Sequence, residues 1–410
     1  MSFNISIKGG LVSKILPYMI TVDVLNGFSL LYFNVNLQIS LILKLIILFV
    51  ILIYSYFKER NYFVILVTLL IFSVTSAFYH FKSQQVFGVF FQSLSDAVKF
   101  LSCLFFIFYF MILEKNGELS EGLLKKITLV GLLTIYANVA LGVMGFGFST
   151  YGNYSIDEGG VGVKGFFFAG NELGPALICL FSSQMILFKN WSMTAKFISA
   201  VVAVIAAVLI STKTAILGIV LLVCWYFSKN IPIYFRLICY SVALFSIFSL
   251  AIDFEYFIRT WEGYALFDKL LFQAEKVDIL YAITSGRTEY ATEILSIYFQ
   301  GIDVGSLLFG IGRSSVNYYG RSIIEVDFLD AFVWFGALGG IAFFASYLCF
   351  FSLIYWRKVK NSEKSNFSLN LALITTISAI SGHVFYSGLV AIPLATLVAC
   401  FILPKSNESI

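Results

Sequence analysis

The sequence is a succession of long apolar runs separated by short polar connections. A helix needs about 20 predominantly apolar residues to cross a bilayer, and this pattern predicts about twelve such helices. Inside a bilayer every backbone hydrogen bond must be made internally, so such runs favour helical spans. We therefore expect an all-α polytopic membrane protein with one integral membrane domain over residues 1–410. The predicted spans are residues 11–31, 37–57, 61–80, 87–113, 127–147, 165–188, 194–211, 214–228, 235–252, 326–355, 367–387 and 389–403.

One long interval, residues 253–324, interrupts this pattern because it is rich in charged and aromatic side chains. Its length and composition favour short amphipathic helices that lie on a membrane surface. Because nearly all the rest of the chain is apolar, chemistry on a water-soluble group should be anchored in this interval. We predict that it is a large extracytoplasmic loop that covers a site.

Composition supports the membrane assignment and excludes several classes of protein. Apolar residues make up 60% of the 410 residues and charged residues 12%, against about 25% charged residues in an ordinary soluble domain. The net charge of +4 is too small to indicate a nucleic-acid partner. The six cysteines lie in apolar runs without a C-x-x-C spacing, and the chain has only two histidines. We therefore expect no metal centre, no disulfide framework and no cofactor.

The distribution of lysine and arginine predicts the orientation of the spans. Sixteen of these residues fall in connections or termini on one side of the predicted bundle, against three in the short connections of the other side. Basic residues are retained on the cytoplasmic side, while long translocated loops contribute little to this rule. Both termini should then be cytoplasmic, and the interval 253–324 should lie outside.

Two polar positions at the predicted outer ends of spans are candidates for the site. Asn171 follows the glycine- and phenylalanine-rich segment 165–170, and it is either a helix cap or a group that shapes a binding site. Lys213 lies between two apolar runs, in a polar stretch that begins at Ser211. It either extends to the membrane interface or meets an anionic headgroup such as a pyrophosphate. Its predicted outward location favours the second interpretation.

Three arginines of the long interval are candidates for phosphate binding. Arg287, Arg313 and Arg321 each follow a glycine directly. The guanidinium group is planar and permanently charged and suits phosphate oxygens, and glycine lets a backbone approach closely. Surface ion pairing is the alternative for each of them. The glycine pair 310–312 is not a nucleotide fingerprint, because no strand–helix unit surrounds it.

Acidic residues at the start of the predicted span 326–355 are candidates for a catalytic base. Glu325 and Asp327 could deprotonate or orient an acceptor group, with Asp330 a weaker candidate. Acids that offset the positive end of a helix are the alternative interpretation. His383, near the outer end of the span 367–387, is a further candidate, although a lone histidine in such a span also serves in helix packing.

These pieces together resemble the O-antigen ligase and polysaccharide repeat-unit polymerase superfamily of bacterial envelopes. Its members are multi-span enzymes with a large extracytoplasmic loop late in the chain. The order of the pieces, the loop and the predicted topology carry the resemblance, from about residue 165 to 345. The matching pieces are Gly165 to Asn171, Ser211 to Ala215, Ser285 to Arg287, Leu308 to Gly312, and Glu325 to Gly340 with Phe335-Gly336 near its end.

Two departures from the family pattern bear on function. Lys213 stands where the family often has arginine, which weakens the case for bidentate phosphate binding there. Many ligases have a His-Asn pair before the span that here begins at Glu325-Val-Asp327. The expected histidine is therefore absent, and its role would fall either to an acidic residue or to His383 from another span. This departure favours a polymerase over a ligase that acts on lipid A-core.

The resemblance implies metal-independent transfer of a glycan from an undecaprenyl-diphosphate donor to a lipid-linked acceptor, at the outer face of the bacterial cytoplasmic membrane. It implies that Arg287, Arg313, Arg321 and Lys213 hold the diphosphate, that Glu325 or Asp327 acts on the acceptor hydroxyl, and that Asn171 shapes the site. The implied partners are undecaprenyl-diphosphate-linked oligosaccharides, membrane lipid and a chain-length regulator protein. A flippase of lipid-linked oligosaccharide, an O-antigen ligase and an assembly protein without activity are the alternatives.

Overall fold

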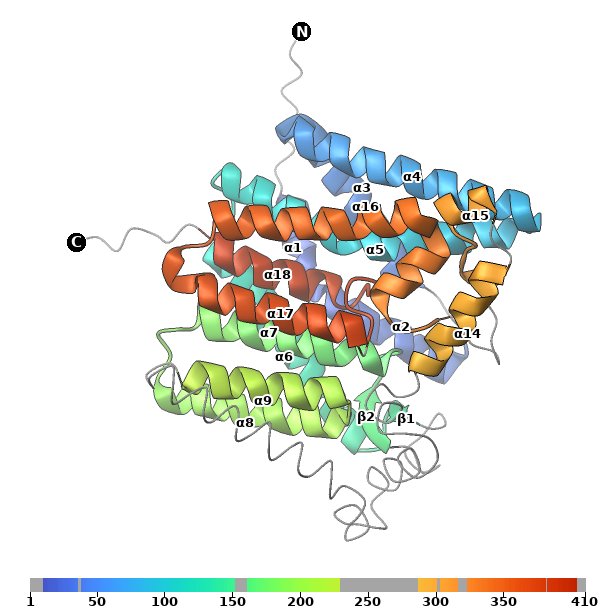
Figure 1. Cartoon of the computed structure of the whole chain (residues 1–410). Helices are drawn as coiled ribbons and strands as arrows, with labels where there is room; N and C mark the ends of the chain where they lie inside the picture. The colour runs from blue at the N-terminus through green and yellow to red at the C-terminus, as the bar shows by residue number, and fades with distance from the viewer. Residues whose placement is uncertain are drawn as a thin grey trace.

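Helices with similar axis directions form one bundle (Figure 1). The computed structural model describes residues 10–35, 38–151, 161–228, 287–300, 303–315, 323–380 and 382–403. Within these ranges seven helical segments are long and apolar enough to cross a membrane, and the shorter helices α9 and α18 are also apolar. The prediction of an all-α polytopic membrane protein is confirmed.

The elements follow one another in chain order as follows: α1 (Gly10–Ile15), η1 (Leu16–Tyr18), α2 (Met19–Phe33), α3 (Ile39–Lys58), α4 (Arg60–Gln84), α5 (Phe87–Lys115), α6 (Glu121–Val143), β1 (Phe148–Tyr151), β2 (Val161–Gly165), α7 (Gly170–Leu187), α8 (Met193–Ile210), α9 (Lys213–Phe227), α14 (Arg287–Gln300), α15 (Val304–Phe309), η3 (Arg313–Ser315), α16 (Asp327–Arg357), η4 (Asn361–Glu363), α17 (Lys364–Ile380) and α18 (Ala391–Ile402).

Helices occupy most of each predicted span that the structure describes, and the span 235–252 lies outside the described residues. Most of the interval 253–324 also lies outside, but its described parts contain the short helices α14 and α15, as the composition predicts. The last predicted boundary differs from the structure. Helix α17 ends at Ile380, and α18 begins only at Ala391, so a non-helical linker, residues 382–390 as described, separates them.

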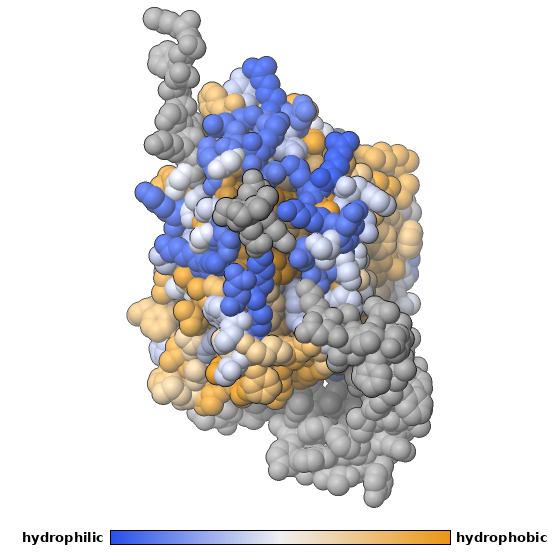
Figure 2. Space-filling model, turned by 90° about the vertical axis from the view of Figure 1, so that its left-hand side faces the viewer, coloured by the Kyte–Doolittle hydropathy of each residue, from blue (hydrophilic) through white to orange (hydrophobic). Residues whose placement is uncertain are grey.

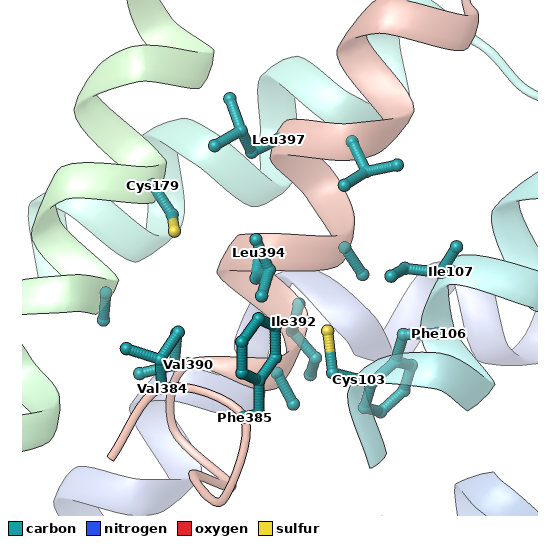
Figure 3. Close-up of a cluster of buried hydrophobic side chains, with 14 of the residues drawn as sticks. Cys103, Phe106, Ile107, Cys179, Val384, Phe385, Val390, Ile392, Leu394 and Leu397 are labelled. Carbon is teal, nitrogen blue, oxygen red and sulfur yellow. The ribbon is translucent and has the colours of Figure 1, made fainter. Parts of the chain in front are cut away.

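The core lies around α5, which packs against α4 and α18, while α7 packs against the other side of α18. Every residue of α18 is buried. Figure 3 shows Val384, Phe385 and Val390 of the linker in the same apolar cluster as Cys103 and Phe106 of α5 and Leu394 of α18. The linker is therefore part of the core. The described cysteines, including Cys103 and Cys179, are free.

A two-stranded antiparallel hairpin, β1–β2, precedes α7 and was not predicted from the sequence. Buried Asn138 of α6 fixes its end, because Asn138 Nδ2 donates to the Lys164 carbonyl (2.7 Å) and Asn138 Oδ1 accepts from the Phe166 amide (3.1 Å). Gly165 has a φ of +55°, and a Cβ there would meet the Asn138 carbonyl oxygen at 2.3 Å. The hairpin thus places the start of α7 against α6.

The two ends of the bundle differ in character. Figure 2 shows hydrophilic side chains gathered at the end opposite α14 and α15. The connections α3–α4, α5–α6, α7–α8 and α16–α17 meet there, and ion pairs such as Lys115–Glu59 (2.6 Å) and Lys358–Glu114 (2.8 Å) join them. This is the basic end that the lysine and arginine count predicts. The loop end is the opposite one, where α5, α7, α9 and α16 begin.

Candidate functional site

Residues 303–313 are held at the loop end by contacts with α4 and α5. The Phe309 carbonyl accepts hydrogen bonds from Ser76 Oγ (2.7 Å) and lies 3.0 Å from His80 Nε2. The other ring nitrogen of buried His80 bonds Ser93 Oγ of α5 (2.8 Å). His80 is thus a buried link between α4, α5 and the loop, and the segment that leads to Arg313 has a fixed position.

The next residues of this segment, Ile311 and Gly312, bind to α16 at a kink. Gly336 has a φ of 71°, so the helix is interrupted there and the carbonyls of the preceding turn need other partners. The amide of Ile311 donates to the Val333 carbonyl (3.0 Å), and the amide of Gly312 donates to the Trp334 carbonyl (3.2 Å). The glycine motif 310–312 therefore docks the loop onto the broken helix, and Arg313 follows directly.

The linker 382–390 is a second interruption, and Asp327 satisfies its backbone. Asp327 is fully buried, and its Oδ2 accepts from the amides of Val384 and Phe385 (both 2.9 Å) and from Ser378 Oγ (2.8 Å). Non-helical backbone at membrane depth is stable only where its polar groups are bonded within the protein. His383 Nδ1 lies 3.4 Å from Asp327 Oδ1. Two predicted catalytic residues are thus brought together, in a buried setting.

Glu325 lies just before α16 and is held in a strained backbone conformation. Its φ is 65°, in the left-handed region that glutamate seldom adopts. Buried Asp330 compensates, because its carboxylate accepts from the amides of Ile324 (2.9 Å) and Glu325 (3.0 Å). Asp330 is therefore a positioning residue, because its hydrogen bonds hold the backbone of Glu325 in this left-handed conformation. Strain of this kind concentrates at functional sites.

Arg287, Glu325 and Asn171 form one cluster although they lie far apart in the sequence. Arg287 Nη2 is 2.6 Å from Glu325 Oε2, and Asn171 Nδ2 donates to the same oxygen at 3.0 Å. Arg287 is only 7% exposed, whereas the Glu325 side chain is 30% exposed. Asn171 does not cap α7, whose N-cap residue is Ala169. We call this cluster the Arg287 cluster.

Lys213 is the second cation near this cluster. It begins α9, a helix outside the seven long spans, at the loop end. Burial and, to a smaller extent, the positive charge of Arg287 together lower the pKa of Lys213 to about 8. The Arg287 charge therefore acts on Lys213, and an anion between the two cations would relieve their repulsion.

Arg313 belongs to a different group of side chains. Its Nη1 donates to Tyr386 Oη (3.2 Å), and its guanidinium lies over the Trp334 ring, 5.8 Å from the centroid. Tyr386 in turn donates to the buried carboxylate of Asp96. These contacts of Arg313 are thus made with Tyr386 and Trp334, which are not part of the Arg287 cluster. Arg321 lies outside the described residues.

In a comparison with known protein families, residues 262–407 match the family described as O-antigen ligase like membrane protein. This segment is an O-antigen ligase-like membrane domain. The resemblance seen in the sequence is thereby confirmed, and the domain includes Arg287, Arg313, Glu325, Asp327 and His383. No curated protein and no solved structure matches the chain significantly.

Several residues of this O-antigen ligase-like domain and its surroundings were not among the site candidates chosen from the sequence. Asp96 and Lys99, on α5, are ionisable residues inside an apolar run, a pattern that often marks a functional position. Glu172, next to Asn171, accepts from Ser387 Oγ of the linker. Tyr386 could not be singled out from the sequence, because a tyrosine in an apolar segment is common. Within the described residues no three His, Cys, Asp or Glu side chains come together as a metal site.

Proposed function

We propose that this protein is a polymerase of undecaprenyl-diphosphate-linked oligosaccharide repeat units. It transfers the growing glycan from one polyprenyl diphosphate to a new lipid-linked repeat at the outer face of the bacterial cytoplasmic membrane. The O-antigen ligase-like family supports membrane glycan processing in general terms. The more specific proposal rests on the Arg287 cluster together with nearby Lys213, which combine two cations with one partly exposed carboxylate at the loop end.

The chemistry requires charge stabilisation of a diphosphate leaving group. The acceptor hydroxyl attacks the anomeric carbon of the donor sugar, and the bond from that carbon to the phosphate oxygen breaks. The bonding electrons leave with the diphosphate, and the hydroxyl proton passes to a carboxylate. Preplaced cations stabilise the developing negative charge. Arg287 and Lys213 supply this charge, without a metal, in our proposal.

The ion pair between Arg287 and Glu325 suggests how the base is activated. Without substrate the guanidinium lies 2.6 Å from the Glu325 carboxylate. A diphosphate competes for the guanidinium, so donor binding frees the carboxylate to take the proton of the acceptor hydroxyl. Asn171 keeps Glu325 oriented through its 3.0 Å hydrogen bond. Asp327 and His383 support the linker beside the site in this proposal.

The location of the cluster supports an outer-face reaction with both termini cytoplasmic. The Arg287 cluster lies at the loop end, and hydrophilic side chains gather at the opposite end (Figure 2), where the connections rich in lysine and arginine meet. Basic connections favour the cytoplasmic side. Undecaprenyl-diphosphate-linked oligosaccharides are the proposed substrates, and a chain-length regulator protein is a proposed partner.

The proposal is tested by electrophoresis of surface glycan from a deletion strain that carries wild type, Arg287→Ala or Arg357→Ala. Arg357 is an exposed arginine at the basic end of α16 and is the matched control. We expect a full ladder with wild type and Arg357→Ala. Deletion and Arg287→Ala should leave single repeats, with equal amounts of each protein in the membrane.

Other outcomes identify the alternatives. Loss of all surface glycan on deletion would indicate a flippase of lipid-linked oligosaccharide. Polymer that accumulates on its lipid carrier, without transfer to lipid A-core, would indicate a ligase. A full ladder in the deletion strain would contradict all three activities.

A further inference from the structure

A second group of charged side chains lies at the loop end, and the Arg287 cluster does not include it. Lys99 Nζ and Arg313 Nη1 both donate to one oxygen, Tyr386 Oη, at 3.1 and 3.2 Å. Tyr386 Oη donates to Asp96 Oδ1. The three parts of the chain that meet here are α5, the loop segment at η3, and the linker 382–390. We call these residues the Lys99 cluster.

The positive charge of the Lys99 cluster exceeds its negative charge. Two cations face one carboxylate, because the nitrogens of Lys99 and Arg313 form ion pairs with Asp96 Oδ1 at 3.8 and 3.6 Å. The other oxygen, Asp96 Oδ2, is buried and accepts no hydrogen bond from the described residues. Within this cluster the single carboxylate of Asp96 can therefore offset the charge of only one of the two cations.

The arrangement directs the excess charge outward. The Asp96 side chain is 3% exposed, whereas the side chains of Lys99 and Arg313 are 35% and 25% exposed. A buried carboxylate thus lies behind two accessible cations that share one phenol oxygen. Two cations that contact the same phenol oxygen repel each other, and a bound anion stabilises both. Arginine adds a planar fork that matches phosphate oxygens, and lysine adds a point charge.

We propose that the Lys99 cluster binds the diphosphate of a second lipid-linked chain, an inference that rests on the proposed polymerase function. A polymerase joins two chains, each attached to its own lipid diphosphate, and only the donor diphosphate leaves. The Arg287 cluster, with Lys213, also has two cations and one carboxylate. The structure therefore provides two sites of like charge, one for the donor and one for the retained diphosphate of the acceptor.

The surroundings of the Lys99 cluster suit a lipid-borne anion. Phe87 and Phe91 lie on α5 between its loop-end start and Lys99, and they are 64% and 57% exposed. Phe78 of the adjacent α4 is 60% exposed and packs near Phe90, with ring centroids 5.6 Å apart. An exposed apolar surface thus lies on the loop-end parts of α4 and α5, and α5 is also the helix that carries Lys99, which suits a headgroup attached to a prenyl chain.

The test counts bound ligands by native mass spectrometry of the purified full-length protein with undecaprenyl diphosphate as the probe. We expect two bound molecules for wild type and one for Lys99→Gln. Lys99→Arg should keep two, because it preserves the charge, and Lys82→Gln should keep two as an exposed control at the loop end of α4. Arg287→Ala should lose the other molecule, and the double variant with Lys99→Gln should bind none.

Competition distinguishes the sources of the anion. Inorganic diphosphate should displace both bound molecules, whereas phosphatidylglycerol at equal concentration should displace neither. Displacement of one molecule by phosphatidylglycerol would overturn the assignment in favour of an ordinary lipid headgroup. A single molecule on wild type, or two on a folded Lys99→Gln protein, would also overturn it. Failure of the polymerase proposal can be told apart from these outcomes. It would show as a full glycan ladder in the deletion strain, whatever number of ligands the protein binds.

Discussion

At the scale of single residues, the protonation of Lys213 connects the site to pH. The pKa of Lys213 is lowered to about 8, first by burial and then by the charge of Arg287. The lysine is therefore charged below pH 8 and loses its charge as the pH rises through that value. A lysine at its ordinary pKa of about 10.4 would remain charged throughout this range.

Binding of a lipid diphosphate should therefore weaken between pH 7 and pH 9. The charged fraction of a group with this pKa falls from about nine-tenths to about one-tenth, so the affinity should fall by up to about tenfold. Lys213→Arg should remove this part of the dependence, because arginine stays charged. Titrating undecaprenyl diphosphate into both purified proteins at several pH values measures the difference. An equal fall in affinity for both proteins would show that the pH dependence comes from the ligand and not from Lys213.

Residue types at the site could be predicted from the sequence, but their grouping could not. Arg287, Glu325 and Asn171 were all candidates because of their chemistry and position. Their convergence depends on tertiary contacts across 38 and 154 residues, which no local pattern encodes. The left-handed backbone of Glu325 depends on Asp330, which the sequence suggested only as an acid near a helix start. The assignment of Arg313 to a separate cluster likewise depends on Tyr386.

At the scale of elements, the kink of α16 and the loop segment at residues 308–312 form one unit. A Cβ on Gly336 would lie 2.5 Å from the Gly310 nitrogen and the Leu308 carbonyl oxygen, which are backbone atoms that side-chain rotation cannot move. Gly336→Ala should therefore lower thermal stability and detach the loop. With a φ of 71° and a ψ of −173°, this backbone conformation is essentially restricted to glycine, and it alone costs alanine about 1–3 kcal/mol.

Thermal melting of the purified protein in detergent, followed by size-exclusion chromatography, measures this loss. Gly88→Ala is the matched control, because Gly88 lies in α5 with no atom within 4 Å of the added Cβ. It should keep or slightly raise stability, by up to about 1 kcal/mol. Equal melting temperatures for Gly336→Ala and wild type would contradict the docking role of the kink.

The spans could be predicted at this scale because apolar length is a strong signal, as in α3 and α5. The linker 382–390 could not be predicted, because Val384 and Phe385 continue the apolar run while the backbone leaves the helix. Its Val384 and Phe385 amides donate to the carboxylate of Asp327, which belongs to another helix. The hairpin β1–β2 was missed because it is short and depends on Asn138.

At the scale of the whole molecule, the two ends of the bundle predict opposite exposure across the membrane. Val304, at the start of α15, is 74% exposed at the loop end, and Ser362 is exposed at the basic end. In a background without native cysteines, Val304→Cys should react with a membrane-impermeant maleimide in intact spheroplasts. Ser362→Cys should react only after the membrane is broken. The reverse pattern would invert the proposed orientation and place the site on the cytoplasmic side.

The burial of Asp327 also has a consequence for biosynthesis. Its partners Ser378 and Val384 to Tyr386 lie 51 to 59 residues later in the chain. When the translocon releases α16, this carboxylate has none of these donors, and an unpaired charge in a bilayer is unfavourable. The nascent chain therefore cannot complete the hydrogen bonds of Asp327 until α17 and the linker 382–390 emerge. Truncation directly after α16 would leave this carboxylate without those donors, so the packing of α16 is completed by residues made later.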